Sequence, residues 1–221
     1  MKKIIFIFIL LNVLAGCSSG NGGEQQASGE HAEKVATEKP QLKVKDEVYV
    51  PNPQITDDLK LTEAGQTISD DKGKLTLKAY KKVNEPIKVG PMDLTVKEVK
   101  VMHFVPDYSM IDFFHSYTQE EEFDVVKIGV EFKNTSKEKV KFTPIAQLKM
   151  NSGEHKMWED DIYLEELNGE IAENGDNKGN IGFILTDTNT EDIKSVELLT
   201  SDAVDKNGKS IEKGRKIKID F

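Results

Sequence analysis

The stretch FDVVKIGVEFKNTS (residues 123–136) decides the fold of this chain. Large apolar side chains take every second position in it: Val126, Ile128, Val130 and Phe132. A period of two is typical of a half-buried β-strand. Asn134, Thr135 and Ser136 then provide side chains that favour a turn. We therefore expect a strand that ends near residue 134 and returns antiparallel.

The same alternation recurs on both sides of this stretch. It appears in residues 75–79, 92–105, 140–150, 181–185, 196–198 and 217–221, with turn-forming residues between most of these segments. In residues 92–105 the phase slips by one residue at Lys97 and Glu98, and a β-bulge would absorb that slip. Short strands separated by turns predict an all-β fold, an antiparallel β-sandwich of about seven to nine strands.

Residues 106–122 interrupt the alternation. Ile111 and Phe114 have helical spacing, and Asp107 precedes them at a plausible helix start. We expect one short helix inserted between two strands. This insert is the most aromatic part of the chain, with four candidate partner-binding residues: Tyr108, Phe113, Phe114 and Tyr117. They either cap the end of the sandwich or form an exposed patch that docks a partner, because aromatic residues are enriched at interfaces.

Two histidines and two aspartates also fall in or beside the insert: His103, Asp107, Asp112 and His115. Imidazole and carboxylate groups are suitable ligands for a divalent metal. Their spacing matches no compact zinc motif. The alternative is that His103 is a hydrogen-bonded core residue on the face of Val101, and that His115 is a solvated helix residue.

The amino-terminal residues have the order of an export signal. Two lysines at positions 2 and 3 precede an apolar run over residues 4–14, and small residues lead to Cys17. The run is shorter than the roughly 20 residues that a spanning helix needs. Leu14-Ala15-Gly16-Cys17 resembles the lipobox of bacterial lipoproteins. That resemblance implies cleavage before Cys17 and a diacylglycerol on its sulfur, which holds the protein on the extracytoplasmic face of the cell membrane.

The chain divides by composition into four parts. Residues 1–16 are the expected signal peptide, and residues 17–45 are the lipidated cysteine followed by a flexible linker with almost no large apolar side chain. Residues 46–74 form a semi-ordered lead-in, and the sequence leaves open whether it packs on the domain. Residues 75–221 form the β-sandwich domain.

Composition excludes several functions. Cys17 is the single cysteine, so an acylated chain has no thiol left for a disulfide, a thiolate metal site or a nucleophile. Cleavage removes two of the 30 Lys and Arg residues, so the mature chain carries 28 against 39 acidic residues, a net charge of −11. Such a surface disfavours nucleic acid as a partner. The alternative is that the excess of acidic residues serves only to keep the protein soluble.

Three segments carry a family resemblance: KVNEPIKVGPMDLTVKEVKV (residues 82–101), residues 123–136, and GDNKGNIGFIL (residues 175–185). In this order they resemble a family of Gram-positive lipoproteins with an immunoglobulin-like, telokin-like domain. The resemblance covers roughly residues 75–221 and extends to the lipobox and linker. It implies an immunoglobulin-like β-sandwich and no catalytic residue.

The sequence thus favours a non-enzymatic, membrane-anchored lipoprotein that binds an envelope or extracellular protein, a peptide or a wall component outside the membrane. The covalent diacylglycerol on Cys17 is the one non-protein group that we expect. The alternative is an accessory lipoprotein that binds a small ligand or a metal through residues 103–122.

Overall fold

The computed structural model describes residues 49–221 of this chain. The predicted signal peptide, Cys17 and the linker lie outside the described residues. In the described part no helix is both long enough and apolar enough to cross a bilayer.

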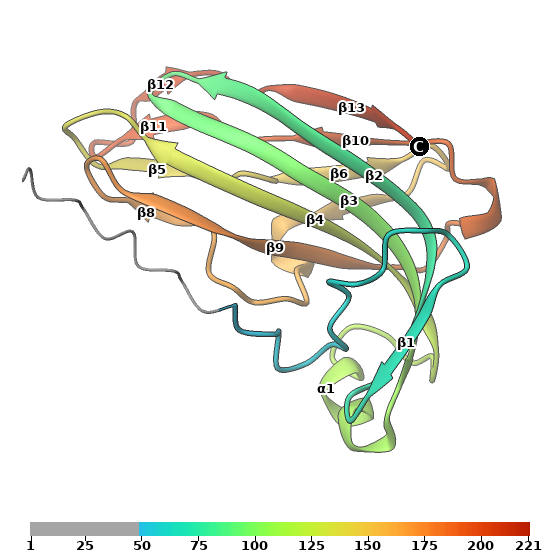
Figure 1. Cartoon of the computed structure of the whole chain (residues 1–221). Helices are drawn as coiled ribbons and strands as arrows, with labels where there is room; N and C mark the ends of the chain where they lie inside the picture. The colour runs from blue at the N-terminus through green and yellow to red at the C-terminus, as the bar shows by residue number, and fades with distance from the viewer. Residues whose placement is uncertain (1–48) are drawn as a thin grey trace, which may run out of the picture. The chain divides into compact units, whose positions relative to one another are not determined.

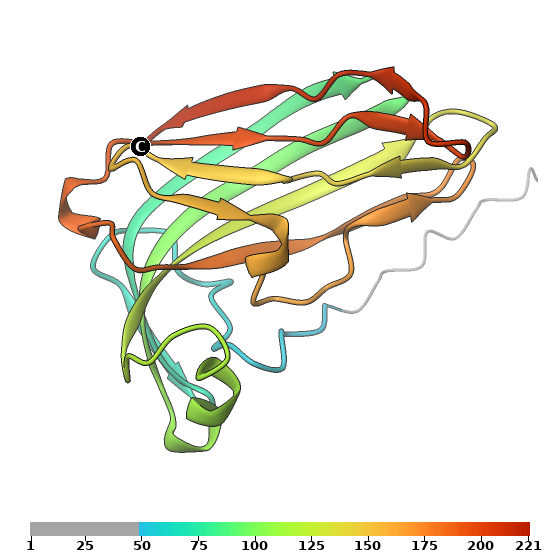
Figure 2. The same ribbon diagram turned by 180° about the vertical axis from the view of Figure 1, so that it is seen from behind.

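Three antiparallel sheets make up the fold (Figures 1 and 2). The largest has the order β1 (Thr67–Asp70), β2 (Gly73–Val89), β3 (Met92–Pro106), β4 (Phe123–Asn134) and β9 (Asp176–Leu185). The second contains β13 (Lys216–Asp220), β10 (Ser195–Leu199), β6 (Gln147–Met150) and β7 (His155–Met157). The third contains β12 (Ser210–Glu212), β11 (Ala203–Asp205), β5 (Val140–Phe142) and β8 (Gly169–Ile171).

The main core lies between the five-stranded sheet and the two smaller sheets. The alternating residues of the 123–136 stretch belong to it, and Val126, Ile128, Val130 and Phe132 are at most 2% exposed. Leu148, Val196 and Leu198 of the second sheet and Phe142 of the third belong to the same core. This arrangement confirms the prediction of an all-β, antiparallel fold. The strands outnumber the expected seven to nine because several of them have only three residues.

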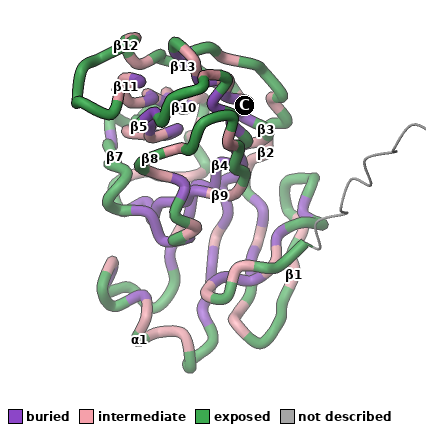
Figure 3. The backbone as a smooth tube through the Cα atoms, turned by 90° about the vertical axis from the view of Figure 1, so that its left-hand side faces the viewer, coloured by how far each residue is buried: buried purple, intermediate pink, exposed green. Residues whose placement is uncertain are grey.

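A second hydrophobic core lies on the face of the five-stranded sheet that points away from the main core. It is near one end of the long strands, where α1 and β1 lie (Figures 1 and 3). Met102 and Phe104 of β3 and Val125 of β4 point into it, whereas their neighbours Val101 and Val126 point into the main core. Ile55 and Leu61, which precede β1, are each 2% exposed within it. The lead-in therefore packs on the domain, which answers the question that the sequence left open.

Two local predictions are confirmed in detail. The pairing of β3 with β4 shifts register between Val96 and Glu98, where the sequence predicts a bulge. At the end of β4 the Asn134 side chain accepts hydrogen bonds from the backbone N–H and the hydroxyl of Ser136. It also donates to the carbonyl of Ala172 at 2.9 Å, so this turn residue joins two loops.

The insert between β3 and β4 is helical, as predicted. A 3₁₀ helix, η1 (Tyr108–Met110), leads into α1 (Ile111–Phe114). The Asp107 carboxylate caps η1 by accepting the Ser109 N–H at 3.0 Å. The described residues also contain two further 3₁₀ helices, η2 (Trp158–Asp160) and η3 (Thr190–Asp192).

Candidate functional site

The outer face of the five-stranded sheet, opposite the main core, holds a buried cluster of charges. Lys100 of β3 and Lys127 of β4 are paired directly across the two strands. Asp58, in the described part of the lead-in (residues 49–74), reaches over the sheet. Its carboxylate oxygen lies 2.7 Å from the Lys100 Nζ and 2.6 Å from the Lys127 Nζ. Glu98 lies 3.1 Å from Lys127, and the Lys100 Nζ lies 5.6 Å from the centre of the Tyr80 ring.

These charges neutralise one another. Burial acts to raise the pKa of Asp58, but Lys127 and Lys100 outweigh it and hold the pKa below its ordinary value of 3.8. Burial acts to lower the pKa of Lys127, but Asp58 and Glu98 hold it above its ordinary value. Both groups therefore stay charged at neutral pH. The cluster fixes the lead-in to the sheet through the contacts of Asp58 with Lys100 and Lys127.

The loop over residues 157–166 lies beside the lead-in, below β9 in Figures 1 and 2. Asn52 of the lead-in donates to the Tyr163 carbonyl at 2.9 Å. The Tyr163 side chain is buried in the second core. A Cβ on Gly182 of β9 would collide with the Tyr163 ring, so glycine at this position allows the ring to pack on the strand.

The buried Asp161 and the partly buried Glu165 determine the path of this loop. Asp161 accepts the backbone N–H groups of Gly182 at 2.8 Å, Tyr163 at 3.0 Å and Leu164 at 3.3 Å. Burial raises the pKa of Asp161 and outweighs these bonds. Glu165 accepts the backbone N–H of Asn180 at 2.9 Å. The loop is thus tied to β9 on both sides of Leu164.

Leu164 is held in an unusual conformation. Its φ is +55° and that of Glu166 is +51°, in the left-handed region that residues other than glycine rarely adopt. The Leu164 side chain is nevertheless 52% exposed. Met157 and Trp158, at the start of the same loop, are 46% and 41% exposed. The hydrogen bonds to Asp161 therefore hold the backbone from which the exposed Leu164 side chain projects.

The surroundings of these apolar residues are acidic. Residues 157–177, the acidic segment, contain no Lys, Arg or His and eight carboxylates: Glu159, Asp160, Asp161, Glu165, Glu166, Glu170, Glu173 and Asp176. Asp161 is buried and Glu165 is partly buried, and the other six are exposed. This segment is not among the residues that the sequence predicted to bind a partner. Its long run without a cation, together with the single tryptophan, is the signal that could have found it.

The predicted partner-binding residues of the insert have different surroundings. Tyr108 is 89% exposed, whereas Phe114 is 1% exposed in the second core. Phe113 and Tyr117 are partly buried against the same core. The inclusion of Phe114 in a docking surface was wrong, because its ring packs edge to face on Phe104 at 5.5 Å. These residues mainly close the second core, and Tyr108 remains available at the surface.

The four predicted metal ligands are not brought together, and the described residues contain no group of three or more His, Cys, Asp or Glu side chains placed to hold a metal. The Asp107 carboxylate accepts from Ser109, and Asp112 and His115 are exposed on or next to α1. The alternative prediction, that His103 is a hydrogen-bonded core residue, is wrong about its burial, because the side chain is partly exposed. Its Nδ1 lies 2.8 Å from the Asp124 carboxylate.

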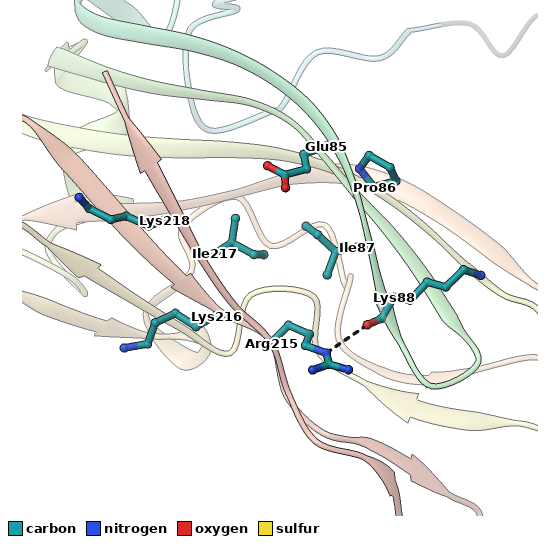
Figure 4. A pocket seen from close by; sticks show the side chains of 8 residues that line it. All are labelled: Glu85, Pro86, Ile87, Lys88, Arg215, Lys216, Ile217 and Lys218. Carbon is teal, nitrogen blue, oxygen red and sulfur yellow. Dashed lines mark hydrogen bonds between the residues drawn. The ribbon is translucent and has the colours of Figure 1, made fainter.

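A groove runs along the seam between the edge strand β13 and the part of β2 that β1 does not pair with (Figure 4). Four cations line it, Lys88, Arg215, Lys216 and Lys218. Each of them lies within 3.0 Å of a carboxylate, the partners being Asp93, Glu212, Glu197 and Asp220 respectively. Pro86 and these charged side chains are the features by which edge strands resist pairing with other chains. We interpret the groove as a protected edge.

Residues 1–18 match the family described as the prokaryotic membrane lipoprotein lipid attachment site, which supports the predicted lipobox and a membrane-anchored lipoprotein. The chain is 46% identical, over the whole length of both proteins, to a Bacillus subtilis (strain 168) protein named "Uncharacterized protein YdhF". It belongs to the same family as that protein.

The solved structures are less similar to this chain than the Bacillus subtilis protein is. A functionally unknown protein from Listeria monocytogenes EGD-e shares 14% identity at a TM-score of 0.48, over 67% of this chain and 88% of its own. A conserved hypothetical protein from Bacillus anthracis also shares 14% identity, at a TM-score of 0.38, over 60% of this chain and 94% of its own.

Proposed function

We propose that this lipoprotein is a non-enzymatic binding module on the extracytoplasmic face of the membrane, and that it docks a partner protein through the loop over residues 157–166. The observation that carries the proposal is the exposed, left-handed Leu164 on a loop fixed by Asp161. The immunoglobulin-like assignment of the domain belongs to the same proposal, and the packing of two antiparallel layers supports it.

Strain at Leu164 favours a functional role for the loop. A left-handed conformation of a residue other than glycine costs on the order of 1–3 kcal/mol and persists where the surroundings enforce it. Here the enforcing contacts are the hydrogen bonds from the Tyr163 and Leu164 N–H groups to Asp161. The result is an apolar side chain presented to solvent, which adds nothing to the core.

Preorganisation makes such a surface suitable for binding. A loop that is already fixed loses little conformational freedom when a partner docks. Trp158 adds a residue type that is enriched among the side chains dominating binding energy. The buried ion pairs of Asp58, in contrast, serve to attach the lead-in beside this loop.

Photo-crosslinking in intact cells tests the proposal. A photoreactive amino acid at position 164 should capture one partner protein in high yield. The same amino acid at position 211, where Ile211 is 46% exposed on β12, is the matched control and should capture little. Equal capture of many proteins from both positions, or no capture from position 164, would contradict the proposed function.

A further inference from the structure

The charges around the loop define the kind of partner that fits it. We infer that the partner presents a cationic segment with an apolar side chain at its centre, such as a Lys- or Arg-bearing stretch of another protein. This inference rests on the proposed function and adds to it the chemistry of the partner.

The apolar part of the surface is small and lies within one loop. Met157 and Trp158 are exposed at its start and Leu164 near its end, with the η2 turn between them. Such a centre suits one or two apolar side chains of a partner. A large apolar face would need more exposed area than these three residues provide.

Exposed carboxylates adjoin each apolar residue along the chain. Glu159 follows Trp158, and Glu166 follows Leu164 after one residue. Both side chains are exposed, and within residues 49–221 neither makes a side-chain hydrogen bond or an ion pair. Their charge is thus available to a partner, unlike that of Glu170, which binds Lys139 at 2.6 Å.

Electrostatics then discriminates between classes of partner. The acidic segment places no cation among its eight carboxylates, so it repels anionic polymers and anionic headgroups and attracts a basic segment. Charge complementarity therefore favours a cationic protein surface over the membrane to which the chain is anchored. It also disfavours a second copy of this acidic chain.

The chain has a built-in probe for this interaction. Trp158 is its single tryptophan, so the intrinsic emission of the whole protein reports on the proposed surface. The test uses the full lipidated protein in a non-ionic detergent, titrated with three nine-residue peptides. One alternates Lys and Leu, one alternates Lys and Gly, and one alternates Glu and Leu.

The Lys and Leu peptide should shift the Trp158 emission to shorter wavelength in a saturable manner. Raising the salt concentration from 0.05 to 0.5 M should weaken its binding at least about fivefold, because salt screens exposed charges. The peptides that lack either the charge or the apolar side chain should bind at least about tenfold more weakly. A similar shift with the Glu and Leu peptide, or no shift with any peptide, would overturn the inference.

Charge variants locate the effect. The double variant Glu159→Gln and Glu166→Gln should bind the Lys and Leu peptide about threefold to tenfold more weakly, since it removes two exposed charges that would pair with the lysines of the peptide. The double variant Glu121→Gln and Glu191→Gln makes the same change of net charge elsewhere and should bind within about twofold of the unchanged protein. Equal weakening by both variants would assign the effect to net charge and overturn the inference.

If a lipid bilayer or a second copy of this chain occupied the surface, the Trp158 emission would respond differently. An emission shift on vesicles of phosphatidylcholine would assign the surface to a lipid bilayer, and a shift that depends on protein concentration alone would assign it to a second copy. Either result would overturn the inference. If position 164 captures one partner in cells while all three peptides fail, the proposed function stands and only the cationic class of partner is wrong.

Discussion

Lys100 and Lys127 are paired across β3 and β4, and one carboxylate oxygen of Asp58 contacts both ammonium groups. Two like charges in directly opposed positions of a sheet destabilise it unless an opposite charge intervenes. Asp58 arrives from the lead-in, more than 40 positions earlier than either lysine. The lead-in thus supplies the charge that stabilises this outer face of the sheet.

Replacing Asp58 should therefore destabilise the protein strongly. Asp58→Asn leaves two buried lysines with Glu98 as their one remaining carboxylate within the described residues. Removing one member of a buried ion pair costs about 3–5 kcal/mol. The free energy of unfolding in urea at neutral pH measures this loss. Asp93→Asn, in the exposed pair with Lys88, is the control and should have little effect.

The contribution of Asp58 should also depend on pH. Because the pKa of Asp58 in the folded protein lies below 3.8, its stabilising effect is complete above that value and is lost as the pH falls through the folded pKa. The difference in unfolding free energy between the unchanged protein and Asp58→Asn should be constant from about pH 7 to 5 and narrow at about pH 3. A difference that stays the same across this range would show that the charge of Asp58 is unimportant.

Leu164→Asn should separate binding from folding. Asparagine tolerates the left-handed conformation better than leucine does, and the Leu164 side chain is 52% exposed. The unfolding free energy should therefore stay within about 0.5 kcal/mol or rise. Binding of the Lys and Leu peptide, followed by Trp158 emission, should become at least about fivefold weaker, because one of three exposed apolar side chains is lost. A large loss of stability would instead place Leu164 in a structural role.

The lipid anchor is testable at a single atom. Cys17→Ser removes the sulfur to which we expect the diacylglycerol to be attached, so metabolic labelling with a radioactive fatty acid should mark the unchanged protein and leave the variant unlabelled. Ser19→Ala is the control and should be labelled fully. Label on the serine variant would place the lipid at another residue.

The sequence predicted the longer strands because their alternation reports burial on one face, but it did not predict the short strands β1, β7, β8, β11 and β12. It predicted the bulge at Lys97 and Glu98 and the turn at Asn134, since both depend on residues close in the chain. It could not show that β3 is buried on both faces near Met102 and Phe104. When both faces of a strand are covered, a period of two no longer says which side is inside.

The candidate site was harder to predict for a similar reason. Asp161 accepts a hydrogen bond from the backbone N–H of Gly182, and Asn52 donates one to the Tyr163 carbonyl. The geometry of the loop therefore depends on residues far apart in the sequence. The insert was predicted to dock a partner because it is rich in aromatic residues. Phe114, however, belongs to the second core, which residues of the lead-in and of the long strands build together. A lone Asp58 in a polar stretch carried no sign that it would be buried.

Amide hydrogen exchange tests most directly the claim that the loop is preformed. In the free lipidated protein, the Tyr163 and Leu164 N–H groups should exchange about as slowly as that of Gly182, because all three donate to Asp161. Slow exchange at all three positions is the result that the account predicts. Exchange of the Tyr163 and Leu164 amides at the rate of an unfolded peptide, while Gly182 stays protected, would contradict it.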